Sequence, residues 1–147
     1  MKATLPIRKM DGYGAGHYGA SRGDRIHHGQ DYVAYPGTFI HSEVSGIVTK
    51  IGWPYANDIY RYVQIETTVD GQIYDVRYFY LNPLCEVGDH ILADDIIGTV
   101  QDLTLRYKDT IRNDGTIKKM QCHVHREVKH NGQYFNPEKF LEKLQTA

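Results

Sequence analysis

The sequence predicts a mostly β fold: a compact assembly of antiparallel sheets with long loops and one short helix at the C-terminal end. Composition predicts this first, because 12 tyrosines and 14 glycines among 147 residues favour strands and tight turns over helices. Short runs of β-branched and aromatic residues also recur between turn signals. The length suits one domain with a substantial core. We expect a single domain over residues 1–147, in which 1–10 form an N-terminal extension.

The N-terminal half is expected to start with a loop and to continue as strands. Residues 11–24 are rich in glycine, which disfavours a helix interior, so we interpret them as an ordered loop. A phosphate-cradling loop is a weaker alternative, because no strand precedes it and no Lys-Ser/Thr pair follows it. Strands are then expected over 32–35, 38–41 and 46–51, with a Pro-Gly turn at 36–37.

The C-terminal half is organised by two-residue turn signals, which are Asp-Gly at 70–71 and 114–115 and Asn-Gly at 131–132. Such dipeptides between apolar runs are typical of β-hairpins. A further glycine-containing turn is expected at 85–89. Strands are expected on either side of these turns, over 60–68, 72–81, 90–92, 96–100 and 120–129.

The last expected element is the helix. Asn136 is a preferred N-cap residue and Pro137 a preferred first helical residue. Phe140, Leu141 and Leu144 then share one helical face. The chain from Asn136 to its end is therefore expected to be a short helix and tail.

Charge, hydropathy and cysteine content exclude several classes of protein. With 17 basic and 18 acidic residues the chain has no electrostatic footprint for nucleic acid. No apolar run approaches the length of a membrane span, and the first residues lack the pattern of a signal peptide. Cys85 and Cys122 are too few for a disulfide framework, and we expect both to be buried free thiols. We therefore expect neither nucleic acid nor a membrane as partner.

Two histidine motifs, about a hundred residues apart, carry the candidate chemistry. His27 and Asp31 belong to the first, and Gly29 between them indicates a loop entering a strand rather than a helix. His123 and His125 belong to the second. They alternate along an expected strand, so their side chains share one face, roughly 7 Å apart.

Three imidazoles and one carboxylate together predict an open zinc site. Zinc with three protein ligands and one open position activates water. Structural zinc sites prefer four ligands, often thiolates, and calcium or magnesium would need more oxygens. The spacing leaves open whether both imidazoles of the second motif bind the ion or one acts beside it. The other histidines are expected to be ordinary surface or core residues; they are His17, His28, His41, His90 and His130.

Around these residues the sequence resembles the lysostaphin-type (LytM-like) zinc metallopeptidases, which cut peptide cross-links in bacterial cell walls. The resemblance extends over about 12–141, and an ordered set of short motifs is far more specific than any single one. In chain order the motifs are Tyr18-Gly19-Ala20-Ser21-Arg22, Arg25-x-His27-x-Gly29-x-Asp31, Pro36-Gly37-Thr38, Gly46-x-Val48, Val87-Gly88-Asp89, Ile97-Gly98, His123-x-His125-x-Glu127 and Asn136-Pro137. The resemblance implies the lysostaphin/LytM type of β-sheet fold.

The resemblance also implies roles for single residues. His27, Asp31 and His125 are similar to the family's zinc ligands. His123 is similar to its catalytic histidine, which acts as general base or orients the attacking water. Tyr80 is a departure, because it stands where the family has a second catalytic histidine. Its hydroxyl can donate a hydrogen bond to a developing oxyanion, but its usual pKa of ~10 excludes a general base near neutrality.

Two functions remain open from the sequence. One is a zinc endopeptidase acting on peptidoglycan peptides, in a groove between the loops at 11–24, 52–60 and 101–118. The other is a zinc-holding pseudoenzyme that binds a partner, because the segment around Tyr80 is similar to that of the leukocyte-derived chemotaxins. A lipoyl- or biotinyl-carrier-like domain is a third class, but it leaves the histidines unexplained. The groove could be lined by Tyr13, Tyr18, Trp53 and Tyr55.

The route to the cell wall is a separate expectation. Because no export signal is visible, we expect the chain to travel with a carrier such as a phage tail assembly or a lysis system. It would then be associated with the virion or released to the wall, and otherwise cytoplasmic. A chain trimmed of its signal peptide would look the same.

Overall fold

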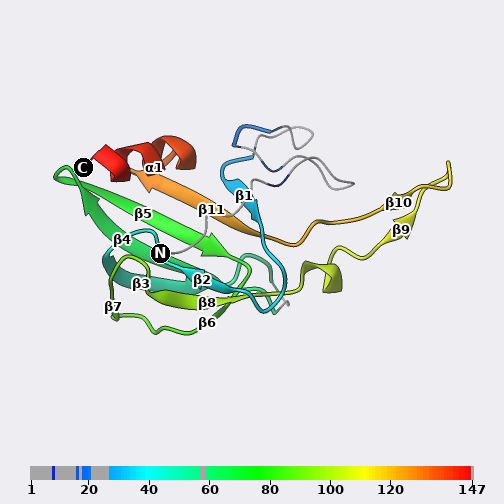
Figure 1. The fold of residues 1–147 in the computed structure, drawn as a ribbon, viewed down its shortest axis with the longest axis horizontal. Helices are drawn as coiled ribbons and strands as arrows, with labels where there is room; N and C mark the ends of the chain where they lie inside the picture. The colour runs from blue at the N-terminus through cyan, green and yellow to red at the C-terminus, as the bar shows by residue number, and fades with distance from the viewer. Residues whose placement is uncertain (1–7, 9–15, 17, 21–26, 57–58, 147) are drawn as a thin grey trace.

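The computed structural model describes residues 8, 16, 18–20, 27–56 and 59–146. Its elements are β1 (Gln30–Val33), β2 (Phe39–His41), β3 (Gly46–Gly52), β4 (Tyr62–Val69), β5 (Gln72–Phe79), β6 (Leu81–Pro83), β7 (His90–Ile91), β8 (Ile96–Val100), η1 (Leu103–Leu105), β9 (Thr110–Ile111), β10 (Ile117–Lys118), β11 (His123–His130), β12 (Gln133–Phe135) and α1 (Pro137–Thr146). The prediction of a mostly β fold with a short C-terminal helix is confirmed (Figure 1). None of the helices in this part of the chain combines the length and the apolar composition needed to cross a membrane.

The strands form two larger sheets and one isolated hairpin. The first sheet has seven strands in the order β1-β11-β5-β4-β3-β7, with β12 pairing to β11 beside this path. The second has the order β2-β8-β6, and β9 pairs with β10 alone. All these pairings within the described chain are antiparallel. The buried core contains residues of both larger sheets and Phe140 of α1, so it joins all three elements.

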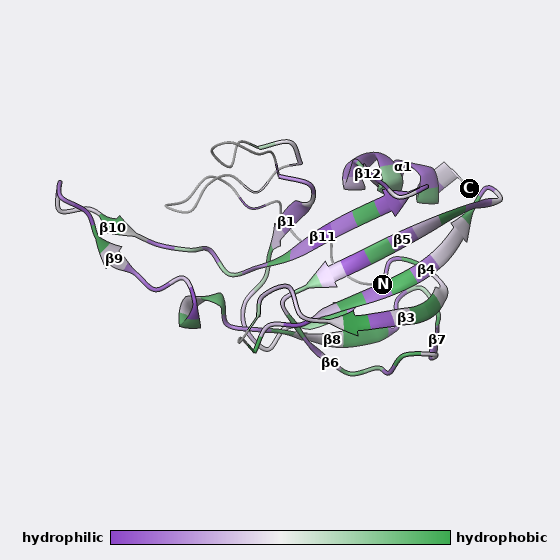
Figure 2. Ribbon diagram, turned by 180° about the vertical axis from the view of Figure 1, so that it is seen from behind, coloured by the Kyte–Doolittle hydropathy of each residue, from purple (hydrophilic) through white to green (hydrophobic). Residues whose placement is uncertain are grey.

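The central strands are amphipathic in the way that a sheet with one covered face requires. In β4, buried and more exposed residues alternate from Gln64 to Val69. Figure 2 shows the corresponding change between hydrophobic and hydrophilic residues along β5 and β11. In β11 this alternation buries Val124 and Val128 in the core, which leaves His123, His125 and Glu127 for the other face.

Two of the predicted turns have the backbone that their residues favour. Asp70 and Gly71 have φ of 51° and 75°, and Asn131 and Gly132 have 52° and 75°. Two successive positive φ values define the type I′ turn, whose twist suits a hairpin. At Asp114-Gly115 only Gly115 has a positive φ, of 85°, and the turn is wider than the expected two residues.

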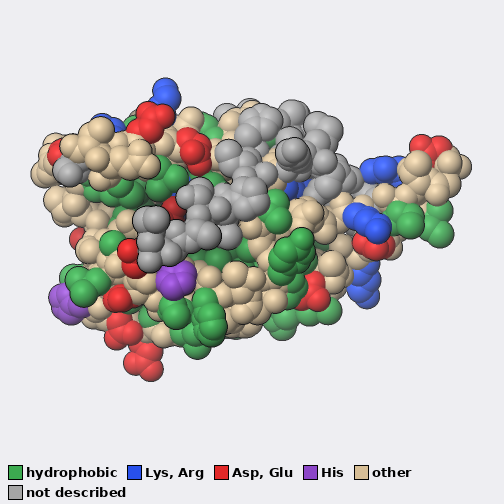
Figure 3. All heavy atoms as spheres, in the orientation of Figure 1, with side chains coloured by type: hydrophobic (Ala, Val, Ile, Leu, Met, Phe, Trp, Pro, Cys, Tyr) green, Lys and Arg blue, Asp and Glu red, His purple; other side chains and the backbone are tan. Residues whose placement is uncertain are grey.

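The hairpin of β9 and β10 projects away from the two sheets (Figure 1). Lys and Arg side chains gather along it (Figure 3). Ile111 and Ile117 face each other in its register, and Ile111 is 81% exposed. The strand expected over 120–129 begins later than predicted, at His123.

Tyr80 is the main departure from the predicted strands. The strand expected over 72–81 ends at Phe79, because Tyr80 has a φ of 73°. That backbone turns the chain out of the larger sheet, and Leu81 begins β6 of the smaller one. The Tyr80 N–H donates to the Arg61 carbonyl at 2.8 Å, which fixes the turn.

Candidate metal centre

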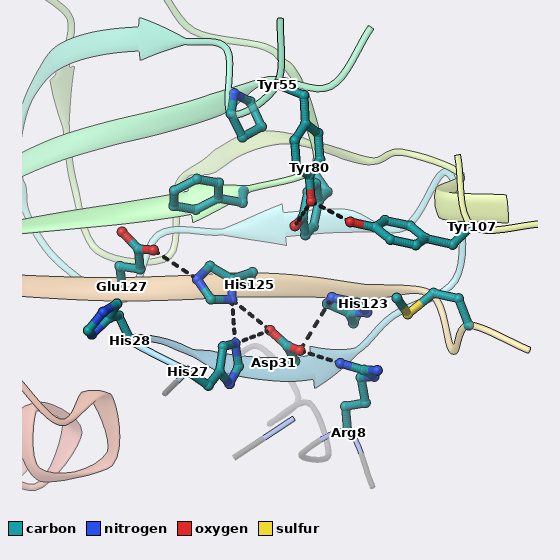
Figure 4. A pocket seen from close by; sticks show the side chains of 13 residues that line it. Arg8, His27, His28, Asp31, Tyr55, Tyr80, Tyr107, His123, His125 and Glu127 are labelled. Atoms are coloured by element: carbon teal, nitrogen blue, oxygen red, sulfur yellow. Dashed lines mark hydrogen bonds and ion pairs between the residues drawn. The ribbon is translucent and has the colours of Figure 1, made fainter. Parts of the chain in front are cut away.

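Pairing of β1 with β11 brings the two histidine motifs together. In the register of these strands Asp31 faces His125, and Val33 faces His123. The Asp31 Oδ1 atom lies 2.7 Å from His125 Nδ1 and 3.2 Å from His27 Nε2. The two imidazole nitrogens are 2.9 Å apart. The three side chains therefore converge on one point, as Figure 4 shows; we call them the ligand trio.

Gly29 is the reason that the first motif can lie this close to His125. A Cβ atom at position 29 would lie 2.5 Å from the His125 ring atoms Cε1 and Nε2. It would also lie 2.5 Å from the carbonyl oxygen of Arg126. Real Cβ atoms do not approach so closely, so this position requires glycine.

Two further side chains hold the trio in place. Glu127 Oε1 lies 3.0 Å from His125 Nε2, on the far side of the ring from Asp31. Such a carboxylate fixes the tautomer of a metal-binding histidine, with the other nitrogen facing the ion. Arg8 Nη1 donates to Asp31 Oδ2 at 2.7 Å, and both side chains are buried. From the sequence, Glu127 was identified only as part of a motif. No sequence pattern pointed to Arg8 as a residue of the site.

The charges of the trio favour a bound cation. Burial raises the pKa of Asp31, but hydrogen bonds with His125 and His27 outweigh it, and the pKa lies well below its usual value. Burial lowers the pKa of His125, whereas its hydrogen bonds to Asp31 and Glu127 raise it to about 9. The imidazole thus sits between two carboxylates, and a metal ion would compete with its proton.

The residues present fit zinc. Two imidazole nitrogens and one carboxylate oxygen are zinc donors, and three of them leave a fourth position open. Donors on bonds of about 2.0–2.2 Å to one tetrahedral ion lie roughly 3.3–3.6 Å apart. The observed separations of 2.7, 2.9 and 3.2 Å are shorter than this by roughly 0.1 to 0.9 Å. The three side chains would have to move apart by this amount to hold the ion.

His123 lies beside the trio rather than within it. Its Nδ1 is 2.7 Å from the Gln121 carbonyl, so Nδ1 carries the hydrogen that is donated there. Nε2 then carries none, and it faces Asp31 Oδ2 at 3.4 Å. Burial lowers the pKa of His123 to about 4, although the charge of Asp31 opposes this. The ring is therefore neutral near pH 7, with an acceptor nitrogen directed at the site.

Tyr80 approaches the same point from the opposite wall. Its ring stands edge-on to that of His123, with centroids 5.5 Å apart. Burial raises the pKa of Tyr80 well above its usual value. The hydroxyl therefore stays protonated near neutrality and can act as a hydrogen-bond donor, but not as a base.

A groove of about 400 Å³ opens over these side chains, and Pro54, Tyr55, Tyr107 and Met120 also line it. Of the aromatic residues expected there, Tyr55 lines the groove. Tyr18 and Trp53 are not among its described lining residues, and Tyr13 lies outside the described residues.

The remaining predicted residues lie around the site or away from it. His28 lines the groove but stacks on Tyr134, with centroids 4.2 Å apart. Cys122 is buried as expected, whereas Cys85 is only half-buried. His17, Arg22 and Arg25 lie outside the described residues, as does most of the loop at 11–24.

A profile of peptidase family M23 matches residues 25–137, which is well over half of the chain. The chain belongs to peptidase family M23. The match contains both histidine motifs and confirms the resemblance to lysostaphin-type enzymes.

The curated relatives include vertebrate proteins. Leukocyte cell-derived chemotaxin-2 of Mus musculus is 28% identical over 126 residues, which cover 86% of this chain and 75% of that protein. The same protein of Bos taurus is 25% identical over the same coverage. Membership of family M23 therefore supports a peptidase. The chemotaxin-2 relatives are not named as peptidases.

The similar solved structures show the fold. Lysostaphin in solution has a TM-score of 0.64 at 21% identity, covering 95% of this chain and 54% of that one. The chain thus spans about half the length of lysostaphin. The catalytic domain of the prophage-encoded M23 protein EnpA from Enterococcus faecalis has a TM-score of 0.64 at 22% identity, covering 94% and 92%. A zinc-containing peptidase from Vibrio cholerae has 0.57 at 20% identity, covering 88% and 39%. The lysostaphin/LytM type of fold is confirmed.

Proposed function

We propose that this protein is a zinc metalloendopeptidase that cleaves peptide bonds of bacterial peptidoglycan. The observation that carries the proposal is His123 beside the ligand trio, at the base of a groove. Membership of family M23 supports the reaction class. The choice of peptidoglycan rests on the motifs shared with lysostaphin-type enzymes.

In this proposal the ligand trio binds the metal ion, and His123 transfers the proton. A zinc ion held by His27 Nε2, Asp31 Oδ1 and His125 Nδ1 would polarise the scissile carbonyl and lower the pKa of water toward ~7. His123 Nε2 accepts the proton of the attacking water. The His123 Nδ1–H keeps its hydrogen bond to the Gln121 carbonyl, so the ring is held in place while it carries the charge. The same proton then passes to the leaving amine.

Tyr80 makes this site different from one with two catalytic imidazoles. Its neutral hydroxyl donates a hydrogen bond to the oxygen that gains charge when the carbonyl is attacked. The proposed enzyme thus has a single base, His123, and a phenol where the resemblance to lysostaphin-type enzymes places a second histidine. Aromatic side chains on the walls, Tyr55 and Tyr107 among them, favour a substrate with small side chains.

A second function is supported by the same tyrosine. In a zinc-holding binding module the trio would stiffen the loops, and the groove would bind a partner without cleaving it. The departure at Tyr80 and the similarity to the chemotaxins favour this alternative.

Digestion of defined muropeptides distinguishes the two functions. Zinc-loaded protein is incubated with cross-linked peptides of known sequence, and products are identified by mass spectrometry. We expect cleavage that stops on chelation and falls about 10²–10⁴-fold in His123→Ala. Elemental analysis should find zinc in both proteins, because His123 lies outside the trio. Zinc-loaded wild-type protein that binds the peptides but leaves them intact would establish the binding module instead.

A further inference from the structure

Three tyrosine hydroxyls from three separate loops meet on one wall of the groove. The Tyr55 hydroxyl lies 3.0 Å from that of Tyr80 and 2.6 Å from that of Tyr107. Tyr55 comes from the loop between β3 and β4, Tyr80 from the turn after β5, and Tyr107 from the chain after η1. Figure 4 shows the contacts as a continuous line of hydroxyls above the ligand trio. We call this the hydroxyl chain.

The rings that carry the hydroxyl chain are fixed by packing. Tyr60 is fully buried and stands edge-on to both Tyr55 and Tyr80. The guanidinium of Arg106 lies 3.7 Å from the centroid of the Tyr55 ring, on its face. Edge-to-face aromatic pairs and cation–π contacts both favour one ring orientation over others. Tyr55 is therefore held between a buried aromatic ring and a cation.

The backbone of Tyr80 also favours one orientation. A φ of 73° is uncommon for a bulky residue, and the surrounding structure must hold it there. The Tyr80 N–H donates to Arg61, and its carbonyl accepts from the Gln101 N–H at 2.8 Å. Strained positions held in this way are frequent at functional sites.

Counting protons gives the hydroxyl chain a direction. Each phenol has one proton to donate. Tyr55 touches two hydroxyls but can donate to only one of them. If Tyr80 donates into the groove, Tyr55 must donate to Tyr80, and Tyr107 must donate to Tyr55. Donation along a chain also polarises each hydroxyl, so the last one becomes a stronger donor.

We propose that Tyr55 and Tyr107 are positioning residues that direct the Tyr80 proton toward the oxyanion formed from the peptide carbonyl. The inference rests on the proposed peptidase function. It assigns Tyr80 as the group that touches the reacting oxygen, with Tyr55 acting directly on Tyr80 and Tyr107 acting through Tyr55.

Tyrosine-to-phenylalanine variants test the hydroxyl chain, because each removes one oxygen and keeps the ring. We expect Tyr80→Phe to lower kcat about 10²-fold, as for loss of an oxyanion donor. Tyr55→Phe should lower kcat about 3–10-fold with KM unchanged, and Tyr107→Phe less. Tyr78→Phe is the matched control. It removes a buried hydroxyl bonded to Glu43 in the core, away from the groove, and should leave kcat within twofold.

Two readouts separate positioning from a merely structural effect. In a double-mutant cycle Tyr55→Phe should add nothing once Tyr80 is already phenylalanine, because it acts only through that hydroxyl. A phosphinic peptide, which mimics the tetrahedral intermediate, should lose affinity in Tyr55→Phe by the same factor as kcat/KM. Its binding to zinc-loaded protein by calorimetry does not depend on turnover.

The outcomes distinguish this inference from the proposed function. If wild-type protein cleaves muropeptides but Tyr55→Phe matches Tyr78→Phe, the hydroxyl chain is wrong and the peptidase stands. The same holds if the Tyr55 and Tyr80 effects multiply in the double variant. If zinc-loaded wild-type protein cleaves nothing, the peptidase and the inference fall together.

Discussion

The two walls of the groove are built in different ways. The ligand trio depends on β1 and β11, two paired strands whose register places Asp31 opposite His125. The tyrosine wall is assembled from three loops that share no strand pairing. One wall is thus set by backbone hydrogen bonds of a sheet, and the other by contacts among side chains. The position of the metal side therefore follows from strand register, and that of the tyrosine side from side-chain packing between loops.

The walls also differ in charge. Around Asp31 the structure gathers a buried guanidinium, three imidazoles and the carboxylate of Glu127. The tyrosine wall carries neutral phenols, because burial raises the pKa of Tyr55 to about 12 and that of Tyr80 well above its usual value. Changes to the ligand trio, Arg8 or Glu127 should therefore affect metal binding and folding, whereas changes to the tyrosines should leave metal binding and folding unchanged.

The largest expected effect comes from Asp31→Asn. The variant would lose a proposed zinc ligand, and it removes the negative charge from a buried ion pair in which Arg8 contacts Asp31 at 2.7 Å. We expect zinc to be lost and the free energy of unfolding to fall by about 3–5 kcal/mol. Thermal unfolding with and without chelator measures both effects: the chelator should lower the Tm of wild-type protein and leave that of Asp31→Asn unchanged.

Glu66→Gln is the control for Asp31→Asn. It removes an exposed carboxylate from β4, far from the metal site in the sheet order. Its unfolding free energy should stay within about 0.5 kcal/mol of wild type. A stoichiometric zinc content in Asp31→Asn would contradict the assignment of this residue as a ligand.

A smaller effect is expected from Glu127→Gln, on the same charged wall. Glutamine keeps the shape of the side chain but loses the charge that fixes the His125 tautomer. Zinc affinity should fall about 10–100-fold, as measured by competition with a coloured chelator. Because the ligands themselves remain, the variant should still bind one zinc ion when the metal is in excess. An affinity within twofold of wild type would mean that Glu127 does not support the site.

The sequence predicted the charged wall better than the neutral one, for a physical reason. Alternation along a strand places His123 and His125 on one face, and turn signals set the hairpins that order the sheet. Convergence of loops leaves no such periodic pattern, so the partners of Tyr80 could not be found from spacing. Arg8 was missed for a related reason. Its backbone N–H donates to the Asp31 carbonyl, but the two residues are far apart in the sequence and no local motif links them.

The break of the strand at Tyr80 is a similar case. Tyrosine is a favoured strand residue, so the pattern from Gln72 to Leu81 predicted one uninterrupted strand. The positive φ arises from tertiary hydrogen bonds to Arg61 and Gln101, which local propensity does not encode. Tyr80, which departs from the family pattern, is thus also the residue whose backbone conformation was predicted wrongly from the sequence.

The smallest expected effect, and the sharpest test of the neutral wall, comes from Tyr80→His. Histidine is among the residues enriched at positive φ, so the backbone at this position should accept it. An imidazole is shorter than a phenol and would not reach the Tyr55 hydroxyl, so a second base is gained while a held donor is lost. We expect kcat to rise by about 3–10-fold, well below the full value of a catalytic base, with zinc affinity and Tm unchanged. Steady-state kinetics against Tyr80→Phe, which should be slower than wild type, checks the direction. A Tyr80→His protein that loses zinc would show that the two walls are not independent, because a change confined to the loops would have disturbed the strands.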